Sequence, residues 1–173
     1  MTMLKTWRLA RCASLLALTL GLTGLSATSG KAEDPVERGR YLATIMDCSG
    51  CHTPGALAGQ PDMAHALGGS DIGFEVPGLG VFYPPNLTSD KETGLGNWSE
   101  AEIIAAVRSG VRPDGRELAP VMPWHSYGAL TDADAKALAA LIKSLPPFPH
   151  KAPGPFGPNE PPTAPYLTVA MPE

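Results

Sequence analysis

Five consecutive residues, Cys48-Ser49-Gly50-Cys51-His52, constrain this chain more than any other feature of its sequence. The spacing C-x-x-C-H is the attachment motif of c-type haem. Two cysteines separated by two small residues place their sulfurs on one short helical turn, where they can add to the two vinyl groups of the porphyrin. The adjacent imidazole then faces the iron from the same side. We therefore predict one covalently bound haem c, attached at Cys48 and Cys51, with His52 as an axial ligand of the iron.

Three other interpretations of these cysteines are weaker. A thioredoxin-like redox pair would follow a strand in a βαβ unit, whereas a helical pattern precedes Cys48. A structural zinc site needs four ligands, and only two of the three cysteines lie outside the N-terminal segment described next. A disulfide between Cys48 and Cys51 would leave His52 without a role. Haem attachment is the interpretation that uses all three residues.

Residues 1–32 have the pattern of a secretory signal peptide. Three basic residues are followed by a leucine- and alanine-rich stretch over residues 12–25, which contains no Asp or Glu and is short for a membrane span. The small residues in Gly30-Lys31-Ala32 offer a cleavage site, and Ala27 is an alternative position. An uncleaved N-terminal anchor is the competing interpretation. The pattern predicts export of the remaining chain to the periplasm.

The charge balance argues against a nucleic-acid-binding protein. The chain has 13 Lys and Arg against 17 Asp and Glu, a formal net charge of −4, and no run of basic residues. Cleavage after residue 32 would remove four basic residues and no acidic one, which leaves a net charge of −8. An acidic exported protein is steered toward positively charged surfaces on protein partners.

Three segments have the apolar spacing and the end signals of helices. The first begins at Asp34-Pro35, an N-cap followed by proline, and runs into Cys48. The second begins with a capping box of Ser99 and Glu102. No strand pair is predicted in the Gly- and Pro-rich remainder, which we interpret as ordered loops. The predicted helices cover about residues 35–48, 99–110 and 131–145.

The predicted helices leave a long loop and a proline-rich tail. Residues 53–97 show no sustained periodicity, and a loop of that length needs something to pack against. A large apolar porphyrin would supply the core that three short helices lack. We predict a domain over residues 33–147 and an extended tail over residues 148–173. The tail either lies on the surface of the domain or is mobile.

The second axial ligand of the iron must come from the face opposite His52. Met122 is the leading candidate because it lies in a proline-flanked coil between the second and third predicted helices. A thioether is a neutral, soft ligand that favours reduced iron and raises the reduction potential. The alternatives are His125, three residues further on, and His65 and Met63 in the first long loop.

Several separate motifs, in order, resemble those of one family. The chain resembles the class I cytochrome c domains of bacteria and looks most like the domains of the cytochrome subunits of alcohol and gluconate dehydrogenases. The resemblance covers about residues 35–147. The matching segments are Arg38-Gly39-Arg40-Tyr41-Leu42, Pro85-Asn86-Leu87-Thr88-Ser89-Asp90, Thr93-Gly94-Leu95-Gly96-Asn97-Trp98-Ser99, Arg112-Pro113-Asp114-Gly115, Met122-Pro123-Trp124 and Leu145-Pro146-Pro147.

The resemblance implies an all-α fold in which helices and long loops surround one haem. Its N- and C-terminal helices would cross, Gly39 would allow their close approach, and Met122 would be the second axial ligand. One difference is that the dehydrogenase subunits carry three haem domains in one chain, whereas this sequence has one attachment motif.

Further residues are expected around the haem. A metal-bound histidine usually donates its other ring N–H to a backbone carbonyl, and the resemblance places that carbonyl near Pro84 or Pro85. Arg108, Trp98 and Arg116 are candidates to hydrogen-bond the haem propionates. The alternative is that Trp98 is a core aromatic residue and that both arginines are solvated.

The expected function follows from the predicted coordination. With His52 and Met122 both bound, the iron has no open position for a substrate, so a non-enzymatic, single-electron carrier is predicted. Its partners would be a dehydrogenase donor and a cytochrome or oxidase acceptor, in a complex that could be associated with a membrane. The alternatives are a permanent electron-transfer subunit of a dehydrogenase complex and, from another class, a haem-based ligand sensor or small enzyme.

Overall fold

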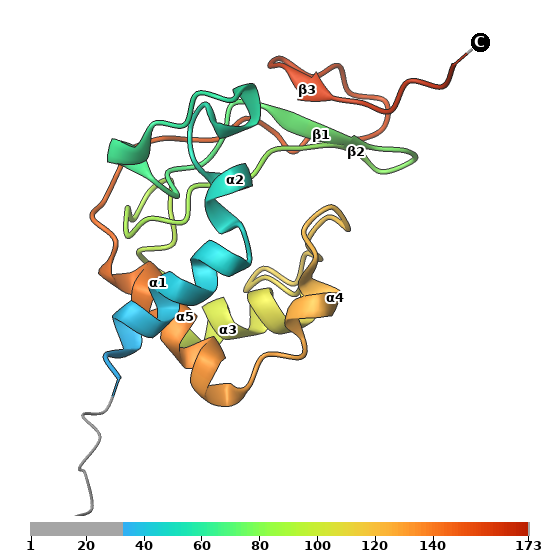
Figure 1. The fold of residues 1–173 in the computed structure, drawn as a ribbon. Coiled ribbons are helices and arrows are strands. Elements are labelled where there is room, and N and C mark those ends of the chain that lie inside the picture. Colours follow the sequence, from blue (N-terminus) through green and yellow to red (C-terminus); the bar gives the residue numbers. More distant parts are fainter. Residues whose placement is uncertain (1–32, 173) are drawn as a thin grey trace, which may run out of the picture. The chain divides into compact units, whose positions relative to one another are not determined.

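Two helices from opposite ends of the domain cross and pack against each other (Figure 1). The computed structural model describes residues 33–172, and the predicted signal peptide lies outside the described residues. Helix α1 (Pro35–Ile45) packs against α5 (Asp132–Ser144). A Cβ atom on Gly39 would collide with the carbonyl oxygen of Ala137 and lie 2.8 Å from the Cβ of Leu141. The predicted crossing at Gly39 is confirmed.

The first helix is shorter than the sequence predicts. Asp34 caps it by accepting a hydrogen bond from the N–H of Val36 at 2.9 Å, as expected. The helix ends at Ile45, and a separate short helix, α2 (Cys48–His52), carries the attachment motif. Asp47 separates them because its backbone is left-handed, with a φ of 53°. The predicted continuous helix into Cys48 is therefore wrong, since the chain turns before the motif.

The second and third predicted helices are confirmed. Helix α3 (Glu100–Ser109) begins with the Ser99–Glu102 capping box and ends at Gly110, whose φ of 72° is easily adopted only by glycine. Thr131 caps α5 by accepting from the N–H of Asp134 at 3.1 Å. A four-residue helix, α4 (Trp124–Tyr127), lies in the coil after Met122. The core contains two apolar clusters, which lie on the helices except for the loop residue Leu95: one of Leu42, Ala43, Ala137, Leu138 and Leu141, the other of Leu95, Ile103, Ala139 and Ile142.

The fold also contains a small sheet that the all-α prediction omitted. Strands β1 (Gly73–Val76) and β2 (Gly80–Phe82) form an antiparallel hairpin, and β3 (Tyr166–Leu167) pairs in parallel with β1, which gives the order β2-β1-β3. Strands of four, three and two residues are too short to show the alternation that identifies strands in a sequence. The long loop also contains two short 3₁₀ turns, η1 (Ala56–Ala58) and η2 (Met63–His65).

The proline-rich tail lies on the surface of the domain. Phe156 exchanges two backbone hydrogen bonds of 2.9 Å with Val81 on β2. The hydroxyl of Tyr83 donates to the carbonyl oxygen of Ala164 at 2.7 Å. Of the two alternatives considered for the tail, the structure shows the docked one. Among residues 33–172, none of the helices has the length and apolar character needed to cross a membrane.

Candidate functional site

Both cysteines of the attachment motif lie on α2 as half-buried free thiols. Burial raises the pKa of Cys48 to about 11, and burial together with the nearby Asp47 raises the pKa of Cys51. At neutral pH both sulfurs are therefore protonated thiols, not thiolates. Gly50, between them, lies against the carboxylate of Asp47, the end of a side chain that would move aside for a Cβ atom. The two sulfurs of the motif are free to be attached to a bound group.

The imidazole of His52 is buried and oriented by a single backbone carbonyl. His52 is 7% exposed, and its Nδ1 atom lies 2.8 Å from the carbonyl oxygen of Pro85. Because a carbonyl can only accept, Nδ1 carries the proton and the lone pair remains on Nε2. Burial lowers the pKa of His52, and the hydrogen bond to Pro85 opposes this only in part. The ring is thus neutral, the state that binds a metal ion, and the predicted carbonyl near Pro84 or Pro85 is confirmed as that of Pro85.

Two loop segments fix the position of the Pro85 carbonyl. We call residues 67–70 and 84–87 together the proximal wall. The N–H of Ser70 donates to the carbonyl of Pro84 at 3.0 Å, and the N–H of Leu87 donates to that of Leu67 at 2.9 Å. The same wall holds the main chain of the motif, because the N–H of Gly69 donates to the carbonyl of His52 at 2.7 Å. Although no regular structure is present here, hydrogen bonds from this wall hold both the ring and the main chain of His52.

The coil that carries Met122 leads into α4, which contacts the turn just before the attachment motif. Met122 is half-buried, and its N–H donates to the carbonyl of Ala119 at 2.9 Å. Tyr127 on α4 donates to the carbonyl of Met46 at 3.0 Å. Burial, followed by the proximity of Cys48 and Cys51, raises the pKa of Tyr127 to about 12. The chain after Met122 is therefore packed beside the cysteines, while Met122 as an axial ligand stays a prediction.

The alternative ligands for the second axial position have other environments. His125 is exposed and stacks on Trp124 with ring centroids 3.5 Å apart. His65 pairs with Asp62 at 2.6 Å and stacks on Phe148. Met63 is 62% exposed. None of these contacts is with a residue of the motif, and Met122 remains the leading candidate.

Two residues that were predicted to hydrogen-bond the haem propionates, Arg108 and Trp98, contact other protein residues. Arg108 donates to the carboxylate of Asp132 at 2.6 Å, which ties the end of α3 to the start of α5. Trp98 is half-buried against the second apolar cluster, with the guanidinium of Arg112 over its ring at 5.1 Å from the centroid. Sequence reasoning gave Arg112 no role, although an arginine beside an exposed aromatic face is a common pairing. Contact of Arg108 and Trp98 with propionates stays a prediction.

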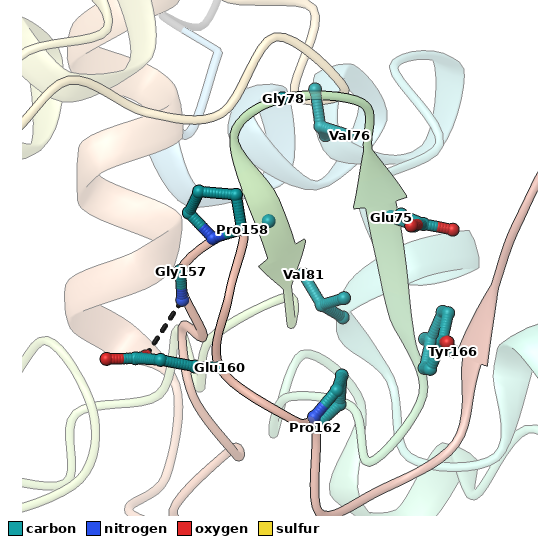
Figure 2. A pocket seen from close by; sticks show the side chains of 10 residues that line it. Glu75, Val76, Gly78, Val81, Gly157, Pro158, Glu160, Pro162 and Tyr166 are labelled. Atoms are coloured by element: carbon teal, nitrogen blue, oxygen red, sulfur yellow. Dashed lines mark hydrogen bonds between the residues drawn. The ribbon is translucent and has the colours of Figure 1, made fainter.

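Arg116 lies beside an apolar hollow near the Met122 coil. The hollow has a volume of about 340 Å³ and lies between Leu79 and Phe82 of the hairpin and residues 116–120. Burial lowers the pKa of Arg116. A second hollow, of about 230 Å³, lies between the hairpin and the tail, where Glu160 accepts from the N–H of Gly157 at 2.8 Å (Figure 2). That second hollow belongs to the docked tail and contains no residue of the motif.

The residues around the motif fit a covalently bound haem. They supply two free thiols on one helical turn, a neutral imidazole with an available Nε2 and, on a separate coil, a thioether. In addition, the indole N–H of Trp124 is buried with no acceptor among the described residues. Its ring packs on Gly110, where a Cβ atom would lie 2.5 Å from it. A buried donor without a protein acceptor is what a site leaves for a bound group.

Comparison with known proteins agrees with this chemistry. The chain is 35% identical over 79% of its length to the cytochrome c subunit of the quinone-type alcohol dehydrogenase of Gluconobacter oxydans, of which the match covers 26%. It is 40% identical over 75% of its length to the gluconate 2-dehydrogenase cytochrome c subunit of Pantoea cypripedii, and 39% identical over 66% to the fructose dehydrogenase cytochrome subunit of Gluconobacter japonicus. These matches cover 28% and 22% of the relatives, so the chain spans about a quarter of their length. The profile of the cytochrome c family matches residues 36–146, and the chain belongs to this family, whose members carry covalently bound haem c.

Proposed function

We propose that this protein is an exported, monohaem cytochrome that carries single electrons between a dehydrogenase and a downstream cytochrome or oxidase. The observation that carries the proposal is the hydrogen bond between the ring of His52 and the carbonyl of Pro85. His52 belongs to the C-x-x-C-H motif, and the chain is a member of the cytochrome c family. This contact prepares a neutral imidazole to bind iron beside two free thiols. The periplasmic location rests on the signal-peptide pattern of residues 1–32.

The chain's residues would hold the group and limit its chemistry. When bound, haem supplies a one-electron redox centre. Cys48 and Cys51 would attach it through thioether bonds, and His52 would bind the iron through Nε2. Met122 would supply the second iron ligand from the protein and leave no site for a substrate. Electron transfer, rather than catalysis at the iron, is the activity that this coordination supports.

The partners are proposed from the relatives. Those named above are cytochrome subunits of alcohol, gluconate and fructose dehydrogenases. A dehydrogenase is therefore the proposed electron donor, and a membrane-associated complex is the proposed setting. The same names favour a second candidate function, in which the protein is a permanent subunit of such a complex and not a mobile carrier.

Two measurements test the proposed function. Intact-mass analysis of natively matured protein should give the mass of the processed chain plus one haem, and a far-red charge-transfer band of methionine ligation should be present in the oxidised spectrum. A colourless protein of bare peptide mass would refute the proposal. Rapid, stoichiometric binding of carbon monoxide to the reduced protein would instead support a ligand sensor, because it requires an open or easily vacated position.

A separation experiment distinguishes the two carrier functions. A mobile carrier should be released in soluble form when the periplasm is extracted. A permanent subunit should co-purify with a dehydrogenase from native membranes.

A further inference from the structure

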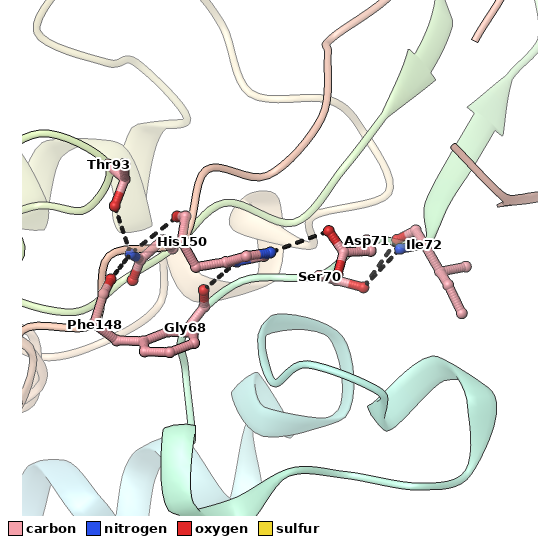
Figure 3. Close-up of polar contacts among 8 residues, drawn as sticks. Gly68, Ser70, Asp71, Ile72, Thr93, Phe148 and His150 are labelled. Atoms are coloured by element: carbon pink, nitrogen blue, oxygen red, sulfur yellow. Dashed lines mark hydrogen bonds and ion pairs between the residues drawn. The ribbon is translucent and has the colours of Figure 1, made fainter. Parts of the chain in front are cut away.

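The segment that follows α5 packs against the proximal wall (Figure 3). We call residues 148–150 the tail clasp. Asn86, which belongs to the wall and is 1% exposed, directs its side-chain Nδ2 at the carbonyl oxygens of Phe148 and His150, at 2.7 and 3.2 Å. Asn86 follows Pro85, whose carbonyl orients His52. The tail clasp is therefore one residue removed from the hydrogen bond that sets the state of His52.

The clasp also holds the other half of the wall. His150 contacts the carbonyl of Gly68 through Nδ1 at 2.8 Å and the carboxylate of Asp71 through Nε2 at 3.0 Å. The ring of Phe148 covers Gly68 so closely that a Cβ atom there would lie 2.6 Å from it. Gly69, the next residue, donates to the carbonyl of His52. Both segments that hold His52 are thus in contact with residues 148–150.

The clasp lies just beyond the residues that the family profile matches. That match ends at residue 146, and the clasp begins at residue 148. The proximal wall consists of loop, with no helix or sheet of its own to fix it. An outer layer that contacts both of its segments limits how far the Pro85 carbonyl can move away from His52.

We propose that Phe148 and His150 are positioning residues that hold the proximal wall, and through it the Pro85–His52 hydrogen bond, in the geometry that sets the reduction potential of the bound haem. This inference rests on the proposed function. A carbonyl held close to the ring N–H makes an axial imidazole a stronger donor to the iron, which favours the oxidised state. Loosening the wall should therefore raise the reduction potential.

The test uses the full-length, haem-loaded protein. The variants are Phe148→Ala and His150→Ala, and the control is Phe156→Ala. Phe156 is also an aromatic residue of the tail, but it packs edge-on against Tyr83 of the hairpin segment, with ring centroids 5.9 Å apart. Two quantities are measured, the midpoint reduction potential and the hydrogen-exchange rate of the His52 ring N–H by NMR of the reduced protein. We expect both clasp variants to show a more positive potential and faster exchange, while Phe156→Ala matches the wild type.

The sign of the shift makes the test specific. Removing any positive charge carried by His150 would lower the potential, so the expected rise has the opposite sign to a simple charge effect. If Phe148→Ala does not retain haem, His150→Ala and the conservative His150→Gln decide the matter. A rise in His150→Ala that His150→Gln partly reverses supports the proposal. Unchanged potential and unchanged exchange in His150→Ala overturn it.

Failure of the proposed function would give a different result. The intact mass and redox spectrum of the wild-type protein are measured first. A wild type that lacks covalent haem refutes the proposed function itself. A wild type with normal haem and clasp variants that are indistinguishable from it refutes only the role of the clasp.

Discussion

At the scale of single residues, the candidate site depends on two groups that act on the iron and its histidine ligand. One carbonyl fixes the tautomer of His52, and one thioether is proposed to complete the coordination. Both groups are uncharged, so neither offsets the positive charge of the iron. The identity of the second ligand therefore has a large effect on the potential.

Replacement of Met122 by alanine is the direct test of the second ligand. We expect Met122→Ala to lose the far-red charge-transfer band and to have a lower reduction potential, because the thioether favours reduced iron. Absorption spectroscopy and redox titration measure both quantities. Met63→Ala is the control, since Met63 is a methionine with a 62% exposed side chain. Survival of the band in Met122→Ala would show that another residue binds the iron.

Gly39 is the residue on which the helix crossing depends. In Gly39→Ala the new Cβ atom would overlap the carbonyl of Ala137, and α1 would have to shift away from α5. Overpacking of this kind costs about 1–3 kcal/mol of stability. The free energy of unfolding is measured by denaturant titration, with Glu37→Ala on the exposed side of α1 as a near-neutral control. Equal stability of Gly39→Ala and wild type would mean that the helices cross less closely than described.

At the scale of elements, each main helix begins at a side chain that accepts a backbone hydrogen bond. Asp34, Ser99 and Thr131 cap α1, α3 and α5. Short helices gain little from propensity alone, so these caps contribute a large share of their local stability. The ends of the helices are fixed by residues that are close in sequence.

The capping box of α3 gives an element-scale prediction. Ser99→Ala removes the acceptor for the N–H of Glu102 and one of the two donors to its carboxylate, while the backbone N–H of residue 99 still donates to that carboxylate. We expect a loss of about 0.5–2 kcal/mol in the free energy of unfolding. Ser109→Ala, at the exposed C-terminal end of the same helix, is the control. A smaller loss in Ser99→Ala than in Ser109→Ala would contradict the role of the box.

The ion pair between Arg38 and Asp134 links α1 to α5 and predicts a pH effect. The side-chain hydrogen bond from Arg38, followed by that from Thr131, lowers the pKa of Asp134. A lowered carboxyl pKa gives stability that is fully present above the unfolded-state value of about 3.9 and is lost as the pH falls through the folded-state value. Wild type should therefore be more stable than Asp134→Asn at pH 6, and the difference should disappear in acid. Urea titrations at a series of pH values measure it, and a difference that does not change with pH would contradict the linkage.

These elements also show how much of the structure the sequence could predict. The starts of the three main helices were predictable because each rests on a cap within four residues of its partner. The break at Asp47 was not, because a left-handed aspartate has no reliable local signal. The sheet was not predictable either. Strands β1 and β3 lie about 90 residues apart in the sequence, and all its strands are too short to show an alternating pattern.

The candidate site divides in the same way. The motif over residues 48–52 is local and was predictable from spacing. The carbonyl near Pro85 was expected only from the resemblance to a family, and the structure then identified it. The pairing of Arg108 with Asp132 joins the end of one helix to the start of another, and no pattern within either helix indicates it. Contacts that depend on the packing of distant elements require the fold.

At the scale of the whole molecule, the domain is built in layers on the His52 side. The motif helix is innermost, the proximal wall surrounds it, and the tail clasp lies outside the wall. The two apolar clusters lie mainly on the helices, and the loops and the hairpin segment add only a few buried apolar side chains, such as Leu67, Val81 and Tyr83. A covalently bound apolar ring would supply the loops with a larger core, which explains how long loops can be ordered here.

The charge of the whole chain predicts how the protein exchanges electrons. The chain beyond residue 32 has a formal net charge of −8, because the first 32 residues account for four basic residues and no acidic one. A negative net charge attracts cations and raises the encounter rate with them, whereas it repels anions and lowers the encounter rate with them. Salt screens the attraction and the repulsion over about 8–10 Å near physiological ionic strength.

Stopped-flow oxidation of the reduced protein measures this effect with two small reagents of opposite charge. The rate with a cationic oxidant such as tris(phenanthroline)cobalt(III) should fall as ionic strength rises from about 0.01 to 0.15 M, while the rate with ferricyanide should rise over the same range. Each reagent is the control for the other, because a salt effect on the protein's potential would move both rates in a related way. Two rates that change in the same direction, or a cationic rate that is insensitive to salt, would mean that local charges near the haem edge outweigh the net charge. In that case the docking patch on the partner would have to be inferred from those local charges instead.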